Sequence, residues 1–197
     1  MLIIFLIWQM IPQVSSYGAY LHIPFCRRRC FYCDFSIEVI GDRTSTIEKE
    51  SQAYTSLLVK EIKKTSKIKN SHDKLETIYF GGGTPSLLPS NQVYTLLTTL
   101  DQEIGIASDA EVTFEMDPAT FDSNKMKEIK SVGVNRVSLG VQSFNNKILE
   151  KSGRAHRLND VYRALEDVTS SKNNFVSIHH MCLTGCMYAH MYIRMFS

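Results

Sequence analysis

The sequence carries little net charge and contains no long hydrophobic run. Its 22 basic and 20 acidic residues leave a formal net charge of +2 over 197 residues, which gives no indication of a nucleic-acid partner or an acidic substrate. The apolar segment at positions 1–11 is too short to span a bilayer as a helix. It also lacks the basic n-region and the clear cleavage site of a secretory signal. We therefore expect no nucleic-acid binding and no membrane span.

The chain also lacks the composition of a secreted disulfide scaffold. Five cysteines are an odd number, and three of them fall in one short segment, which fits a reducing compartment better than an oxidising one. The N-terminal segment is not rich in Arg and Ser, as an organelle transit peptide would be. We expect an intracellular reducing compartment, either the cytoplasm or an organelle (mitochondrion or chloroplast), although no targeting segment is evident.

Acidic residues are absent from the last part of the chain. Residues 171–197 contain no Asp or Glu but hold four of the eight methionines and three of the six histidines. This composition predicts a divergent, unstructured tail after a core at 17–170 and an apolar extension at 1–16. Soft metal ligands gather in the tail, among them Cys182 and Cys186. An accidental sequence explains this cluster better than a metal site does, because the segment has little solubilising charge.

Short apolar runs alternate with longer helical patterns, which is typical of a β/α architecture with a parallel sheet. The helical patterns begin with a capping box from Ser45 to Glu48, and a later one is stopped by Gly133 in the usual C-cap place. These patterns define four βα units, to which Phe175–Ile178 could add a fifth strand. The four predicted strands are Ala19–Ile23, Thr77–Phe80, Glu111–Glu115 and Arg136–Val141.

Three cysteines lie within eight residues, in the pattern Cys26-x3-Cys30-x2-Cys33. Three thiolates at this spacing can bind three irons of a cubane iron–sulfur cluster and leave the fourth iron without a protein ligand. The arginines at 27–29 lie between the first two cysteines, and their charge should favour the thiolate form. A zinc knuckle or a disulfide is the alternative, but zinc needs a fourth Cys or His at comparable spacing, and none follows closely.

Four further motifs follow predicted strands at their C-terminal ends, where β/α barrels place their sites. A glycine-rich turn lets its backbone approach a ligand closely, although it could also be a plain turn before the next helix. Asp117 and Pro118 likewise fit simple turn chemistry. The motifs are Gly81-Gly-Gly-Thr-Pro85, Glu115-Met-Asp-Pro118, Ser138-Leu-Gly-Val-Gln-Ser-Phe144 and Gly153-Arg-Ala-His156.

Together with Tyr20-Leu-His-Ile-Pro-Phe-Cys26, these motifs resemble the radical S-adenosylmethionine (SAM) superfamily. Within it they resemble the branch of oxygen-independent coproporphyrinogen III oxidases and HemW-type haem chaperones, in the family's order over residues 17–170. The resemblance implies an α/β fold that comprises the first four or five βα units of a (β/α)6 barrel. Because the family continues with further βα units and a C-terminal domain, we expect this chain to be a truncated form of a longer protein.

The resemblance also implies a set of site residues. In the family the open iron chelates SAM, and one electron from the cluster then releases a 5′-deoxyadenosyl radical. Carried over, the three cysteines would ligate a [4Fe–4S] cluster, while no catalytic residue and no role for His156 can be assigned. The implied SAM contacts are Tyr20, Tyr32, Gly82, Gly83, Thr84, Glu115, Gln142 and Arg154.

One position separates the two branches of the family. Coproporphyrinogen oxidases carry a further Cys two residues after the third ligand, whereas this chain has Phe35 there, as HemW-like proteins do. We therefore expect a haem chaperone that binds haem or a porphyrin, an electron donor and a haem acceptor protein. SAM cleavage is compatible with this role. The alternatives are oxidative decarboxylation of coproporphyrinogen III and a truncated isoform that binds only the cluster.

Overall fold

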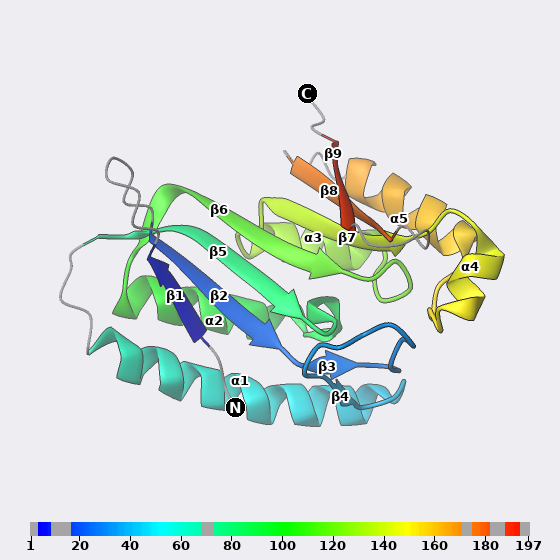
Figure 1. Cartoon of the computed structure of the whole chain (residues 1–197). Coiled ribbons are helices and arrows are strands. Elements are labelled where there is room, and N and C mark those ends of the chain that lie inside the picture. The colour runs from blue at the N-terminus through cyan, green and yellow to red at the C-terminus, as the bar shows by residue number, and fades with distance from the viewer. Residues whose placement is uncertain (1–3, 9–16, 68–72, 171–174, 182–187, 194–197) are drawn as a thin grey trace.

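A computed structural model describes residues 4–8, 17–67, 73–170, 175–181 and 188–193 (Figure 1). A seven-stranded sheet with the order β1-β2-β5-β6-β7-β8-β9 forms its centre. Strands β2 to β8 of this sheet run parallel, and each pairs with the next strand along the chain, as in a β/α barrel. They are β2 (Tyr17–Ile23), β5 (Leu75–Gly82), β6 (Ile106–Met116), β7 (Arg136–Gln142) and β8 (Phe175–Met181).

Both edges of the sheet are formed by antiparallel strands. Strand β1 (Ile4–Trp8) pairs with β2, and β9 (Tyr188–Ile193) pairs with β8. A separate pair of two-residue strands, β3 (Phe25–Cys26) and β4 (Glu38–Val39), lies in the loop that carries the cysteines. Figure 1 shows this pair beyond the end of β2, beside the N-terminal end of the long helix α1.

The helices form one layer against the sheet. Helix α1 packs beside α2, α2 beside α3, and α3 beside α5. Because successive strand residues point to opposite faces, the helix-facing positions of the strands are apolar and buried, for example Leu21, Phe80 and Phe114. The helices are α1 (Thr44–Ser66), η1 (Pro85–Leu87), α2 (Ser90–Glu103), α3 (Ser123–Ser131), α4 (Asn146–Lys151) and α5 (Leu158–Ser170).

The four predicted strands are confirmed, and each lies inside an observed strand that is longer than predicted. Gly133 also ends its helix as predicted, with φ of +109° and its N–H donating to Lys130 O. The predicted capping box is wrong. Helix α1 begins at Thr44 after Arg43 and has no side-chain cap. The backbone carbonyl of Arg43 accepts from the N–H groups of Thr46 and Ile47 instead.

The prediction of an unstructured tail is wrong for 175–181 and 188–193, which form β8 and β9. Strand β8 is the fifth parallel strand that Phe175–Ile178 suggested, and it pairs with the edge of β7 that would otherwise leave backbone groups unpaired. Cys182 and Cys186 lie outside the described residues. Within the described part of the chain, none of the helices has the length and apolar character needed to cross a membrane.

Candidate cluster and cofactor site

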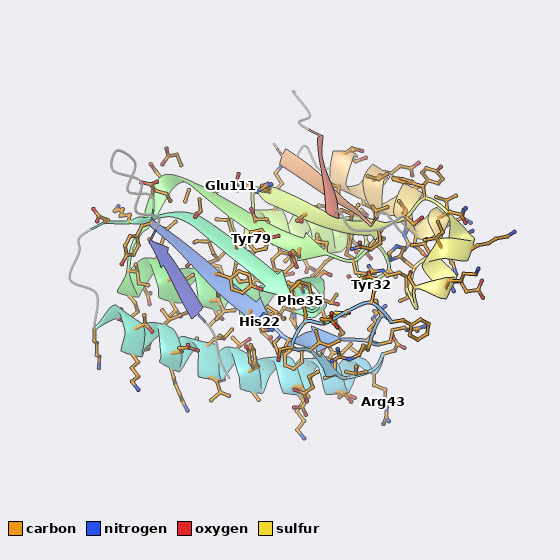
Figure 2. The ribbon with its side chains drawn as sticks, viewed as in Figure 1. His22, Tyr32, Phe35, Arg43, Tyr79 and Glu111 are labelled. Atoms are coloured by element: carbon orange, nitrogen blue, oxygen red, sulfur yellow. The ribbon has the colours of Figure 1, made fainter. Side chains whose placement is uncertain are left out.

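A cavity of about 640 Å³ lies at the C-terminal ends of the parallel strands. Segments far apart in the sequence form it: the cysteine loop, the glycine-rich turn after β5, and the ends of β6 and β7. Figure 2 shows Phe35 of the cysteine loop between Tyr79 of β5 and Tyr32, and all three line the cavity. All the predicted site residues except Tyr20 line this cavity: Cys26, Cys30, Tyr32, Cys33, Gly82, Gly83, Thr84, Glu115, Gln142 and Arg154.

The three cysteines are free thiols that face the same cavity. Cys26 is buried in β3, and the Cys33 N–H donates to Cys30 O at 3.1 Å. Among the described residues no three His, Cys, Asp or Glu side chains could hold a single metal ion. A cubane cluster makes a different demand on the cysteines, because each thiolate binds a different iron of the cluster.

The cation beside these sulfurs is a different one from that predicted. Burial raises the pKa of Cys26, while a hydrogen bond from Thr84 and the charge of Arg154 act in the opposite direction. Arg154 Nη1 lies 3.5 Å from Cys30 Sγ. The arginines at 27–29 contact Asp42 or donate to backbone carbonyls of nearby loops. The local sequence suggested that these three favour the thiolates, but the structure brings an arginine from far along the chain to that position.

The glycine-rich turn is packed closely against the start of the cysteine loop. Gly83 N–H donates to Ile23 O at 2.8 Å, and a Cβ on Gly83 would meet Cys26 Sγ at 2.9 Å. Gly82 has φ of +117°, and a Cβ there would meet the His22 ring at 2.7 Å. Both glycines are therefore needed to seat the turn beside the cysteines.

We expect Gly82→Ala to lower the free energy of unfolding by roughly 2–4 kcal/mol, from backbone strain and overpacking together. Gly140→Ala is a matched control in the same cavity, because its Cβ would meet its nearest neighbours at 3.6 Å, an ordinary contact. Urea denaturation of the two apo-proteins measures the difference. Equal stability of the two variants would contradict the close packing described for the turn.

Glu115 lies at the end of β6, on the cavity wall. Tyr79 donates a hydrogen bond of 2.6 Å to Glu115 Oε1. Burial raises the pKa of Glu115, although Tyr79 and the Gly82 N–H oppose the shift. Tyr20 stacks on Tyr79 with ring centroids 6.0 Å apart, and burial raises the pKa of Tyr20 to about 12. Tyr20 is not among the residues that line the cavity and supports its wall through Tyr79.

Arg154 also lines the cavity and is held by several hydrogen bonds. Its Nη2 donates to Gly140 O at 2.9 Å and to Asp117, and its Nη1 lies 3.4 Å from the Tyr32 hydroxyl. Burial alone would raise the pKa of Asp117, but Arg154, His156 and the Ala119 N–H outweigh it and lower the pKa to about 2. Sequence reasoning missed Asp117 because an Asp before Pro reads as a turn residue.

The residues that line the cavity fit the two groups that the sequence implies. Three free thiols on one wall suit a cluster with three protein ligands. The Nε of Arg154 is buried without a hydrogen-bond partner among the described residues, which suits an anionic ligand group. Glu115 is the matching anion for an ammonium group. The methionine end of SAM carries both a carboxylate and an ammonium.

Three free cysteines at the C-terminal edge of a parallel α/β sheet define the class of protein as one with a candidate metal-cofactor site at the strand ends. Residues 20–189 match the Radical SAM superfamily. The chain belongs to this superfamily, as a HemN/HemW-like member, and a [4Fe–4S] cluster and SAM are the cofactors that this family implies.

Several known proteins are similar to the chain. The heme chaperone HemW of Synechocystis is 46% identical over 168 residues, which are 85% of this chain and 40% of that protein. HemW of Escherichia coli K12 is 34% identical and covers 77% of this chain and 39% of its own length. The anaerobilin synthase of Escherichia coli O157:H7 is 36% identical, with 75% and 33% covered. The chain therefore spans about 40% or less of these relatives.

One solved structure supports the same assignment. Coproporphyrinogen III oxidase (HemN) from Escherichia coli superposes with a TM-score of 0.72 and 25% sequence identity. The match covers 82% of this chain and 36% of that chain. The α/β fold predicted from the sequence, a part of a radical SAM barrel, is thereby confirmed.

Proposed function

We propose that this chain forms the cluster- and SAM-binding part of a haem chaperone of the HemW kind. The observation that carries the proposal is the arrangement of one cavity: three free cysteines, Glu115 and Arg154 all line it. When bound and reduced, the cluster would supply one electron to the sulfonium of SAM. The arrangement supports SAM binding because the lining of one cavity offers a carboxylate and a guanidinium, which complement the charges of the methionine end of SAM.

Each residue of this site would have a limited task. The three thiolates would hold the cluster, and the glycine-rich turn would keep Thr84 within 3.3 Å of Cys26. Glu115 would accept hydrogen bonds from the ammonium of SAM, and Arg154 would donate to its carboxylate. Gln142 and Tyr32 also line the cavity. Cys26 is buried and the other side chains named here are half-buried, so the cavity would partly shield the bound ligands from water.

Phe35 favours chaperone function over porphyrinogen oxidation. This side chain lines the cavity and is 61% exposed, two residues after Cys33. A phenyl ring supplies no ligand or hydrogen-bonding group at the position where coproporphyrinogen oxidases carry a thiol. It does present an exposed apolar surface, which suits the face of a haem or porphyrin ring. We propose haem as ligand on this ground, with an electron donor and a haem acceptor protein as partners in a reducing compartment.

Haem titration against coproporphyrinogen turnover tests this proposal. We expect the anaerobically reconstituted chain to give a saturable haem spectrum and no vinyl product from coproporphyrinogen III with SAM and dithionite. Phe35→Cys restores the thiol of the oxidase pattern and is the matched variant. Vinyl product from the wild-type chain would favour the oxidase, and a cluster without any haem response would favour a protein that binds the cluster alone.

A further inference from the structure

His156 is a fully buried histidine behind the cavity, with an exposed fraction of 0%. It does not line the cavity itself. Its Nε2 lies 2.9 Å from Val141 O, and its Nδ1 lies 3.4 Å from Arg154 Nη2 and 3.5 Å from Asp117 Oδ1. Because a carbonyl oxygen only accepts, Nε2 carries a hydrogen and donates to Val141. Nδ1 is then left to face the Arg154–Asp117 pair.

The carbonyl that His156 binds also closes an unusual turn. Val141 O accepts from Ser143 N–H at 2.7 Å, an i→i+2 hydrogen bond that encloses Gln142. Gln142 has φ of +63° and is the one non-glycine residue with positive φ among the described residues. The pairing of β7 with β8 shifts register between Leu139 and Gln142. A strained turn of this kind persists only where its surroundings fix it.

The second nitrogen of the ring meets another element of the same site. Arg154 Nη2 also donates to Asp117 and to Gly140 O, so His156 completes a buried polar network around one edge of the guanidinium. The other edge faces Cys30 and Tyr32. His156 therefore contacts the supports of two cavity residues, Gln142 and Arg154, through two different ring nitrogens.

We propose that His156 is a positioning residue that sets the Gln142 turn and the Arg154 guanidinium for SAM binding. The inference rests on the proposed function, because it assigns how that site is held in shape. Nε2–H fixes the turn that directs Gln142, and Nδ1 lies against the side of Arg154 that is turned away from the cysteines.

Two substitutions distinguish the roles of Nε2 and Nδ1 of His156. The amide nitrogen of Gln can occupy the position of Nε2, so His156→Gln keeps a donor for Val141 O. The amide of Asn reaches only the position of Nδ1, so His156→Asn loses that donor. We expect His156→Asn to weaken SAM binding about tenfold, the cost of a lost buried hydrogen bond, and His156→Gln to stay within about threefold of the wild type. SAM titrations of the reduced, reconstituted proteins by electron paramagnetic resonance give these affinities, and iron per chain should stay unchanged.

A double-mutant cycle with Gln142→Gly tests whether His156 acts on SAM binding through the Gln142 turn. Glycine adopts positive φ without strain, so His156→Asn should add less than about twofold in that background. Three results would each overturn the positioning role. They are additive losses of SAM affinity in the double mutant, wild-type SAM affinity in His156→Asn, and loss of both iron and SAM binding in the two His156 variants. A wild-type chain that holds its cluster but ignores SAM would overturn the proposed function as well, which distinguishes the two failures.

Discussion

Replacing Cys30 with Ala should abolish the cluster. Anaerobic reconstitution of the wild-type chain is expected to yield about four irons per chain and a broad absorption band at about 400 nm. Cys30→Ala leaves two thiolates, which cannot hold a cubane, so we expect iron to fall to less than about one per chain. The substitution should remove only the thiol. The backbone hydrogen bond from Cys33 N–H to the carbonyl of the half-buried Cys30 does not involve the side chain and can stay in place.

Cys186→Ala is the matched control for this experiment. It removes one thiol from the C-terminal segment, outside the cavity-forming motif, and should leave the iron content and the absorption band unchanged. Full iron content in Cys30→Ala would contradict the assignment of the three cysteines. Loss of iron in Cys186→Ala would instead bring the C-terminal segment into the cluster site.

Replacing Arg154 with Met should destabilise the apo-protein strongly. Arg154 and Asp117 form an ion pair whose side chains are 12% and 14% exposed. Removing one partner of a buried pair leaves an uncompensated charge, which typically costs about 3–5 kcal/mol. Arg163→Met is the control, since Arg163 pairs with Asp160 at 53% exposure and should cost less than about 1 kcal/mol. Urea denaturation measures the free energy of unfolding of both variants. Similar losses of stability in the two would contradict the buried ion pair.

The same pair predicts a pH dependence. The pKa of Asp117 is about 2 in the folded chain and lies below its ordinary value of 3.8. A depressed carboxyl pKa adds stability above the unfolded pKa, and this stability is lost as pH falls through the folded value. The wild type should therefore lose this contribution between about pH 4 and pH 2. Arg154→Met should lose less over that range, because the main cause of the low pKa is gone; parallel losses in acid titrations would contradict this.

Local patterns were sufficient to predict the parallel strands and the place of the cavity. Strand periodicity and the motifs that follow each strand are properties of short segments, and parallel strands bring their carboxyl ends to one edge. The spacing of Cys26, Cys30 and Cys33 likewise needed no knowledge of distant contacts. These features could be read from the sequence because each depends on neighbours within about ten residues.

Contacts between distant segments could not be predicted in the same way. Arg154 reaches Cys30 across 124 positions, and nothing near either residue indicates the other. The burial of His156 and the ion pair of Asp117 with Arg154 also depend on contacts between segments that are distant in the sequence. Tyr20 was assigned as a SAM contact by resemblance alone, and its stacking on Tyr79 depends on the pairing of β2 with β5. Serine before a helical pattern also suggested a cap that the Arg43 carbonyl makes unnecessary.

The response of the reduced cluster to SAM tests the central claim most directly. If one iron lacks a protein ligand and the cavity holds SAM beside it, SAM should change the electron paramagnetic resonance spectrum of the reduced, reconstituted chain. We predict a saturable shift of the signal in the wild type and a weaker response in Arg154→Met. A full cluster signal that SAM leaves unchanged would contradict the assignment of this cavity as a cluster and SAM site.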